Sequence, residues 1–117
     1  MKKIYYLKTC DTCKRIIKEI QPTEDFIYQE IKETEITNLQ IEEMHALSGS
    51  YEALFSKRAK LYKERDLKNE KLEEIDFKNF ILEHYTFLKR PVIIINDQIF
   101  IGNSKKTIDA AKKAIHE

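Results

Sequence analysis

The chain has 117 residues, of which 42% are hydrophobic and only two are glycine and two proline. This length suits one domain that folds without disulfide staples, and the scarcity of glycine and proline leaves little room for long disordered segments. Twenty-one basic side chains are balanced by twenty acidic ones. The densest basic stretch, residues 57–65, is diluted by acids, so we expect a solvated surface there and no direct binding to nucleic acid.

The first seven residues contain a short apolar run that Lys8 interrupts. This run is too short for a secretory signal or a membrane span, so we expect a cytoplasmic protein with no membrane partner. The cytosol keeps thiols reduced, and a bridge between Cys10 and Cys13 would close only a very small loop. A catalytic or redox-sensing role is therefore favoured for the two cysteines over a structural one.

The first third of the chain reads as a strand, a turn, a helix and a second strand. Residues 4–7 form a β-favouring run, residues 9–13 a turn, and residues 14–20 an amphipathic helix that ends at Gln21-Pro22. The second strand, which we expect to run parallel to the first, is indicated by the alternating residues Phe26, Tyr28 and Ile31.

A helical middle follows. Thr37 and Gln40 predict a capping box, and Ser48-Gly49 ends the helix that it opens. We expect this helix to bury a stripe formed by Leu39, Met44 and Leu47. Asp76 is the predicted cap of a later helix. Helical spacing between these two helices is carried by Leu54, Phe55, Leu61 and Tyr62.

The last third returns to β structure. Residues 91–95 are the most hydrophobic run, residues 96–98 a turn and residues 99–101 the return strand of a hairpin. A final helix follows, with one apolar face formed by Ile108, Ala111 and Ile115. The order β-α-β, helical insertion, β-β-α predicts one α/β domain over residues 1–117, with an insertion too short to be a domain of its own.

Cys10 is the strongest candidate for a reactive thiol. It lies at the mouth of the first helix, where free N–H groups favour an anion, and Lys8, Lys14 and Arg15 are near it in sequence. A thiol at Cys13 could also donate a hydrogen bond to a Cys10 thiolate. Cys13 lies one turn further into the helix, which suits a thiol that resolves a mixed disulfide.

Two alternatives to a redox pair are a zinc site and a pair of inert packing residues. The chain has no third cysteine, and the spacing of its three histidines is not that of metal ligands; they are His45, His84 and His116. We therefore expect no bound metal. Burial as a packing residue is reasonable for Cys13, but it is a poor explanation for Cys10 in a polar turn.

Pro91 begins the last hydrophobic strand, directly after Arg90. A proline there removes a hydrogen bond from the sheet, which suits a cis peptide bond and a sharp turn beside a site. An ordinary trans proline at the start of a strand is the alternative, and Pro91 alone does not decide between them.

The chain resembles the arsenate reductase (ArsC) family of thioredoxin-like proteins. That family also includes the Spx regulators and small proteins proposed to be glutathione-dependent thiol reductases, to which the chain is most similar. The resemblance runs nearly end to end and rests on residues 6–14, 53–58, 88–93 and 100–104. It implies a thioredoxin-like fold with a mixed four-stranded sheet and a helical insertion at about residues 37–87.

The resemblance also implies roles for individual residues. Cys10 would be the nucleophile, Pro91 a cis proline, and Arg90 and Arg58 the residues that bind an oxyanion or the carboxylates of glutathione. The expected substrate-binding residues also include Pro91 itself and Lys14, which directly follows the cysteine motif.

The chain departs from the arsenate reductases at two positions. Ser56 stands where they carry an arginine, and a second expected arginine near Gly102 is missing. Each charge-assisted bond from an arginine is worth about 1.5 to 3 kcal/mol, so the two losses disfavour arsenate relative to glutathione or a protein disulfide.

We therefore expect a thiol-disulfide oxidoreductase in which the Cys10 thiolate attacks a disulfide or an oxyanion. Cys13 or glutathione would resolve the product, and the reductant would be glutathione or a glutaredoxin- or thioredoxin-type protein. We expect a monomer with no bound cofactor. The alternative is an Spx-like regulator that binds RNA polymerase and uses the two cysteines as a redox switch.

Overall fold

The computed structural model describes every residue from Met1 to Glu117, and its contacts divide the chain into two compact units. The sheet unit consists of Met1–Thr34 and Arg90–Glu117, and the insert unit consists of Glu35–Lys89. The insert unit is close in its limits to the predicted insertion at residues 37–87. Whether the two units behave as one domain stays a prediction.

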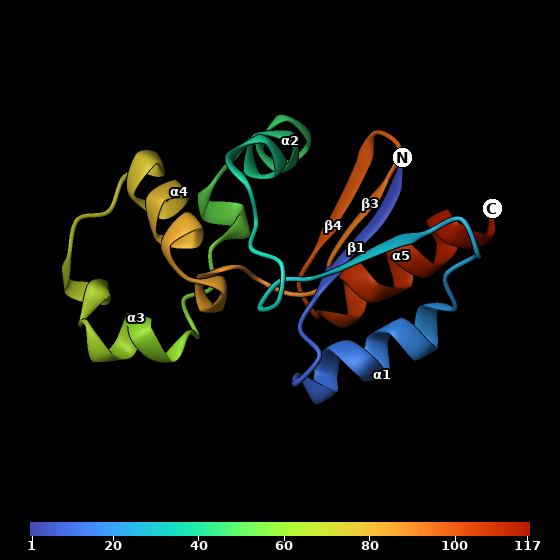
Figure 1. Ribbon diagram of the computed structural model, residues 1–117, viewed down its shortest axis with the longest axis horizontal. Coiled ribbons are helices and arrows are strands. Elements are labelled where there is room, and N and C mark those ends of the chain that lie inside the picture. Colours follow the sequence, from blue (N-terminus) through green and yellow to red (C-terminus); the bar gives the residue numbers. More distant parts are fainter. The chain divides into compact units, whose positions relative to one another are not determined.

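The sheet unit holds four strands and two helices (Figure 1). They are β1 (Lys2–Tyr6), α1 (Asp11–Ile20), β2 (Ile27–Glu30), β3 (Val92–Ile95), β4 (Gln98–Ile101) and α5 (Lys105–His116). The strand order is β2-β1-β3-β4, with β1 parallel to β2 and antiparallel to β3. The predicted mixed four-stranded sheet is confirmed.

The strand directions bring the ends of several strands to the same end of the sheet. Tyr6 pairs with Glu30 at the ends of β1 and β2, and Val92 pairs both with Tyr5 of β1 and with Ile101 of β4. The last residues of β1, β2 and β4 therefore lie at the same end of the sheet as the first residue of β3. The turn that leads from β1 into α1 begins at this end.

One face of the sheet shares a core with α1 and α5, which lie side by side in Figure 1. The buried residues of this core are Ile4, Ile16, Ile20, Phe26, Ile93, Ile95, Ile108 and Ala111, and Ile115 packs against them. Burying one isoleucine side chain stabilises a fold by roughly 1.5 to 3 kcal/mol, so the core holds α1 firmly. The predicted apolar face of α5 is thus confirmed.

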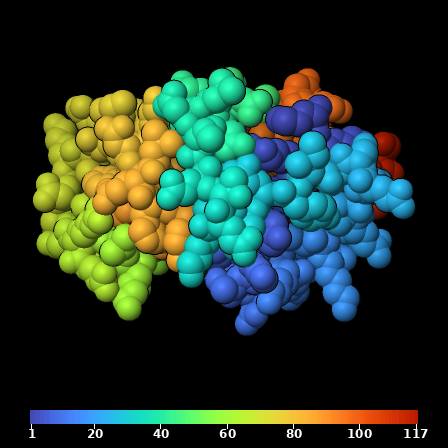
Figure 2. Space-filling model, viewed as in Figure 1, coloured from blue at the N-terminus to red at the C-terminus, as the bar shows by residue number.

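Strand β2 forms one edge of the sheet, and the apolar residues that indicated it are unevenly buried. Tyr28 is 46% exposed, and its neighbour Ile27 is 59% exposed. Phe26 and Ile31, just outside the strand, are buried. An edge strand has a neighbour on one side only, and Figure 2 shows the light-blue segment that contains β2 at the surface.

The insert unit is helical. It contains α2 (Asn38–Ser48), α3 (Lys60–Glu64) and α4 (Glu74–Glu83), with short 3₁₀ helices at Glu52–Leu54, Leu67–Asn69 and Tyr85–Phe87. The predicted capping box of Thr37 and Gln40 opens α2, and Gly49, with φ at 76°, ends it in the left-handed region that glycine tolerates best. None of the helices in either unit is both long enough and apolar enough to span a lipid bilayer.

Two predictions about side chains of the insert were wrong. Leu39 is 76% exposed, and the buried face of α2 is carried by Ile41 and Met44, which are three residues apart. Asp76 is the third residue of α4 rather than its cap, and its carboxylate accepts a hydrogen bond from the Glu73 N–H at 2.8 Å. Both errors arose because several polar and apolar residues near a helix start satisfy the same pattern.

The core of the insert unit is aromatic and is centred on Phe55. This residue was expected in a helix, but its backbone is extended, with φ at −85° and ψ at 130°. Its ring stacks on Phe87 at 5.4 Å and packs against Phe77 at 4.8 Å, measured between ring centroids. Contacts with these distant rings outweigh the local helical pattern.

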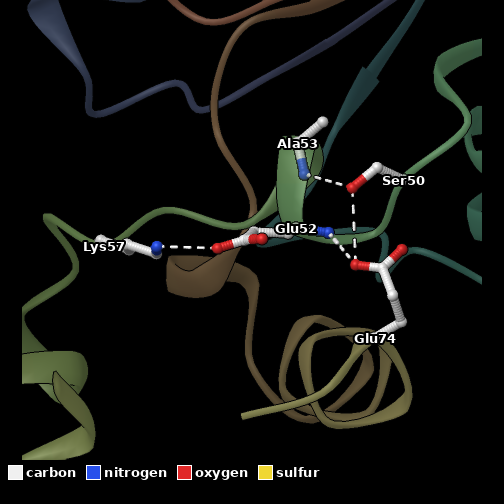
Figure 3. A network of polar contacts seen from close by, with 5 residues as sticks. All are labelled: Ser50, Glu52, Ala53, Lys57 and Glu74. Carbon is white, nitrogen blue, oxygen red and sulfur yellow. Dashed lines mark hydrogen bonds and ion pairs between the residues drawn. The ribbon is translucent and has the colours of Figure 1, made fainter. Parts of the chain in front are cut away.

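A carboxylate at the start of α4 joins it to the first 3₁₀ helix (Figure 3). Glu74 accepts hydrogen bonds from the N–H groups of Tyr51 at 2.8 Å and Glu52 at 3.0 Å, and Ser50 Oγ lies at 3.4 Å. Partial burial would raise the pKa of Glu74, but these N–H donors lower it on balance. The contacts tie the chain after Gly49 to α4.

Candidate functional site

Cys10 caps the N-terminus of α1. Its backbone is extended, with φ at −93° and ψ at 108°, and its Sγ accepts a hydrogen bond from the Cys13 N–H at 3.4 Å. Cys10 is half-buried, whereas Cys13 is fully buried. The predicted placement of Cys10 at the helix start is confirmed, and Cys10 is the more exposed of the two cysteines.

The surroundings of Cys10 favour its thiolate. Partial burial would raise the pKa of Cys10, but it is outweighed by hydrogen bonds from the backbone and side chain of Cys13, by the positive charge of Arg90 and by the Thr12 N–H. The net effect lowers the pKa of Cys10 below its ordinary value of 9.0. A thiolate at this position is the form that attacks disulfides.

The source of the positive charge differs from the prediction. Lys8, Lys14 and Arg15 were expected to stabilise the thiolate because they are near in sequence, yet Arg90 is the basic residue with the largest effect on Cys10. Lys14 and Arg15 are both exposed on α1. A charged side chain on a helix surface points into water, where its field is strongly screened.

Cys13 has the opposite electrostatic character. Its burial, together with the hydrogen bond to Cys10 and the negative charge there, raises the pKa of Cys13 to about 12. At neutral pH the two cysteines therefore hold a thiol at Cys13 beside the more acidic Cys10. The two thiols therefore differ strongly in acidity.

The Arg90-Pro91 peptide bond is cis, as predicted, and Pro91 is buried. The Pro91 carbonyl accepts a hydrogen bond from the Gly102 N–H at 2.9 Å. Because Val92 pairs with Tyr5, Pro91 lies level with the end of β1, at the end of the sheet from which the chain leads to Cys10.

Sequence reasoning missed Glu30, the last residue of β2. Its carboxylate accepts hydrogen bonds from the N–H groups of Lys8 at 2.6 Å, Lys32 at 2.6 Å and Glu33 at 2.8 Å, and the residue is 9% exposed. Partial burial would raise the pKa of Glu30, but these three donors lower it on balance. The sequence did hold a signal, because side chains two residues apart in a strand share a face, and this places the charged Glu30 on the same face as Phe26 and Tyr28.

Lys14 and Arg58, the remaining predicted site residues, lie in different units. Lys14 lies in the sheet unit with both cysteines, but no contact assigns it to a substrate. Arg58 is exposed in the insert unit, so its approach to Cys10 stays a prediction. No group of three or more His, Cys, Asp and Glu side chains is arranged to hold a metal ion.

Arg90 offers a direct test of the electrostatics. Arg90→Ala should raise the pKa of Cys10, since it removes one positive charge near the thiolate, and Arg90→Lys should raise it less. Thiolate absorbance in the ultraviolet, followed against pH, measures both values. Arg15→Ala is the matched control and should leave the titration unchanged, while Arg58→Ala tests whether the second arginine acts on Cys10 at all. An unchanged titration in Arg90→Ala would remove Arg90 from the site.

Known proteins resemble this chain over nearly its whole length. The model of the ArsC family matches residues 5–111. Among solved structures, the chain is similar to a protein named YffB (18% identity, 98% of this chain and 99% of that one covered, TM-score 0.79). It is also similar to an arsenate reductase from Vibrio cholerae (19% identity, 97% of this chain and 96% of that one covered, TM-score 0.72). A third similar structure is an arsenate reductase related protein from Brucella melitensis (17% identity, 93% of this chain and 92% of that one covered, TM-score 0.70). No curated protein matches the chain significantly. The structural likenesses confirm the predicted thioredoxin-like α/β fold.

Proposed function

Because the chain belongs to the ArsC family, we propose that it is a thiol-disulfide oxidoreductase with Cys10 as its nucleophile. Family membership supports thiol oxidoreductase chemistry in general. The observation that supports the specific proposal best is the contrast between the two cysteines: the pKa of Cys10 is lowered at the start of α1, and that of Cys13 is raised to about 12.

In the first step, the Cys10 thiolate attacks one sulfur of a substrate disulfide. A new S–S bond forms between Cys10 and that sulfur, and the original S–S bond breaks. Its electron pair leaves with the second sulfur as a thiolate, which takes a proton from water. The protein is now in a mixed disulfide, and half of the substrate has been released as a thiol.

The second step resolves the mixed disulfide. Cys13 can attack Cys10 only after losing its proton, which burial opposes. Once Cys10 is in a disulfide, however, its negative charge no longer raises the pKa of Cys13. Attack by Cys13 forms the Cys10–Cys13 disulfide and expels the remaining substrate thiolate. Two electrons from glutathione, or from a glutaredoxin- or thioredoxin-type protein, then restore the dithiol.

The substrate is proposed to be anionic, with glutathione as the favoured thiol component. Arg90 supplies positive charge near Cys10, and Arg58 and Lys14 are further candidates for holding carboxylates. The serine at position 56 and the missing arginine near Gly102 make arsenate a weaker substrate than a glutathione mixed disulfide. No bound cofactor is needed for these steps.

A redox-sensing regulator is the second candidate function. The Cys13 N–H contact with Cys10 Sγ shows that the two cysteines are close neighbours at the first turn of α1, which suits a reversible disulfide switch. Regulators of the Spx type bind through a surface of the insert, where Gly49 is the candidate contact, but its place at the end of α2 accounts for a glycine without any partner.

The decisive experiment measures turnover and partner binding on the same protein preparation. Reduction of a glutathione mixed disulfide, coupled to NADPH oxidation through glutathione reductase, should proceed at many times the rate without the protein. Arsenate in a parallel assay should react more slowly. Specific capture of purified RNA polymerase, together with no turnover of either substrate, would replace the enzyme proposal with the regulator.

A further inference from the structure

Glu30 is connected to the backbone of Cys10 through a single peptide unit. Its Oε2 accepts the Lys8 N–H at 2.6 Å, and the carbonyl of the same peptide unit, that of Leu7, accepts the Cys10 N–H at 3.1 Å. A peptide unit is planar, so fixing its N–H end also fixes the direction of its carbonyl. The carboxylate therefore orients the acceptor that holds the Cys10 backbone.

The carboxylate itself is held firmly at the end of β2. Its Oε1 accepts the N–H groups of Lys32 at 2.6 Å and Glu33 at 2.8 Å, which belong to the turn that follows the strand. The Ile31 N–H donates to the Tyr6 carbonyl at 3.0 Å and joins that turn to the end of β1. Glu30 thus joins the turns that follow β1 and β2.

A buried carboxylate is a costly way to satisfy three N–H groups, because water could bind them in an open turn. Its benefit is a fixed direction, since a carboxylate with several donors has little freedom to move. We propose that Glu30 is a positioning residue for the reaction of Cys10. It holds the peptide unit between Leu7 and Lys8 so that Cys10 caps α1 with its sulfur toward the Cys13 N–H. This inference rests on the proposed role of Cys10 as the nucleophile.

Positioning and simple charge predict opposite effects on Cys10. As a bare negative charge, Glu30 would disfavour the thiolate, so its neutralisation would lower the pKa of Cys10. As a positioning residue, Glu30 keeps the sulfur near the donors that favour the thiolate. Its neutralisation would then raise the pKa of Cys10. The sign of the change separates the two roles.

The test compares Glu30→Gln with Glu33→Gln. Both variants remove one negative charge, but the Glu33 side chain is 66% exposed and accepts none of the three backbone hydrogen bonds. We expect Glu30→Gln to raise the pKa of Cys10 and to slow its alkylation by iodoacetamide about threefold at a pH below the wild-type pKa. A rise of one in the pKa lowers the thiolate fraction about tenfold, and the higher nucleophilicity of the more basic thiolate recovers about threefold of that loss, which leaves a net slowing of about threefold. Glu33→Gln should leave the rate unchanged or slightly raise it.

Glu30→Asp provides a second variant that keeps the negative charge but, with a side chain shorter by one methylene, moves the carboxylate oxygens away from the three N–H donors. It should also raise the pKa of Cys10, a result that a charge effect cannot produce. An unchanged or lowered pKa in folded Glu30→Gln overturns the inference, and so does failure of both Glu30 variants to fold, which would make the role purely structural. Because alkylation needs no substrate, these outcomes are distinct from failure of the proposed function, which would appear as absent turnover in the wild-type protein.

Discussion

Replacing Cys10 by serine is expected to lower kcat/KM for a glutathione mixed disulfide by about a thousandfold or more. A serine hydroxyl stays protonated at the start of α1, because the donors that lower the pKa of Cys10 are far too weak to ionise an alcohol. The assay that couples reduction of the mixed disulfide to NADPH oxidation through glutathione reductase measures the loss. The fold should survive, since Cys10 is half-buried and caps a helix, a position that serine also suits.

Cys13→Ser is the matched variant for that measurement. With glutathione in excess, we expect it to retain a tenth or more of the wild-type rate, because an external thiol can resolve the mixed disulfide. Without added glutathione, it should stop after one release of substrate thiol. Equal losses in the two variants under excess glutathione would contradict the division of labour between the cysteines. Full activity in Cys10→Ser would remove Cys10 as the nucleophile.

The elements that carry the cysteines were predictable because they depend on local signals. The strand, the turn and the helix around Cys10 follow from a hydrophobic run, a polar motif and helical spacing within about twenty residues. The hairpin of β3 and β4 is equally local, and Asn96, with φ at 54°, adopts the left-handed backbone that such a short turn needs. Short-range physics therefore determines both segments of the sheet unit.

The parts that were missed depend on residues far apart in sequence. Nothing near Glu30 indicates that Lys8, twenty-two positions earlier, will donate an N–H to it. The extended backbone at Phe55 likewise depends on its ring stacking with Phe87. The source of the charge at Cys10 follows the same rule, since Arg90 reaches the site through the pairing of β1 with β3. Sequence neighbours were a poor guide to spatial neighbours at each of these positions.

The second large effect is expected for Glu30→Gln on the free energy of unfolding. The folded protein lowers the pKa of Glu30 below its ordinary value of 4.5, so the carboxylate stabilises the fold fully above that pH. The stabilisation is lost as the pH falls through the folded pKa. At about pH 7, Glu30→Gln should cost about 1.5 to 3 kcal/mol, the usual contribution of hydrogen bonds to a charged group. Urea denaturation measures it.

The dependence on pH separates charge from shape in that loss. Glutamine matches the volume of glutamate, so a loss caused by the charge should shrink as the pH falls below about 4.5 and the wild-type carboxylate is protonated. All other carboxylates titrate in both proteins, and their effects cancel in the difference. Glu33→Gln, with its exposed side chain, should differ from the wild type by less than about 0.5 kcal/mol throughout. A loss of the same size at every pH would mean that Glu30 acts through its packing, because the hydrogen bonds of a charged carboxylate cannot survive its protonation unchanged.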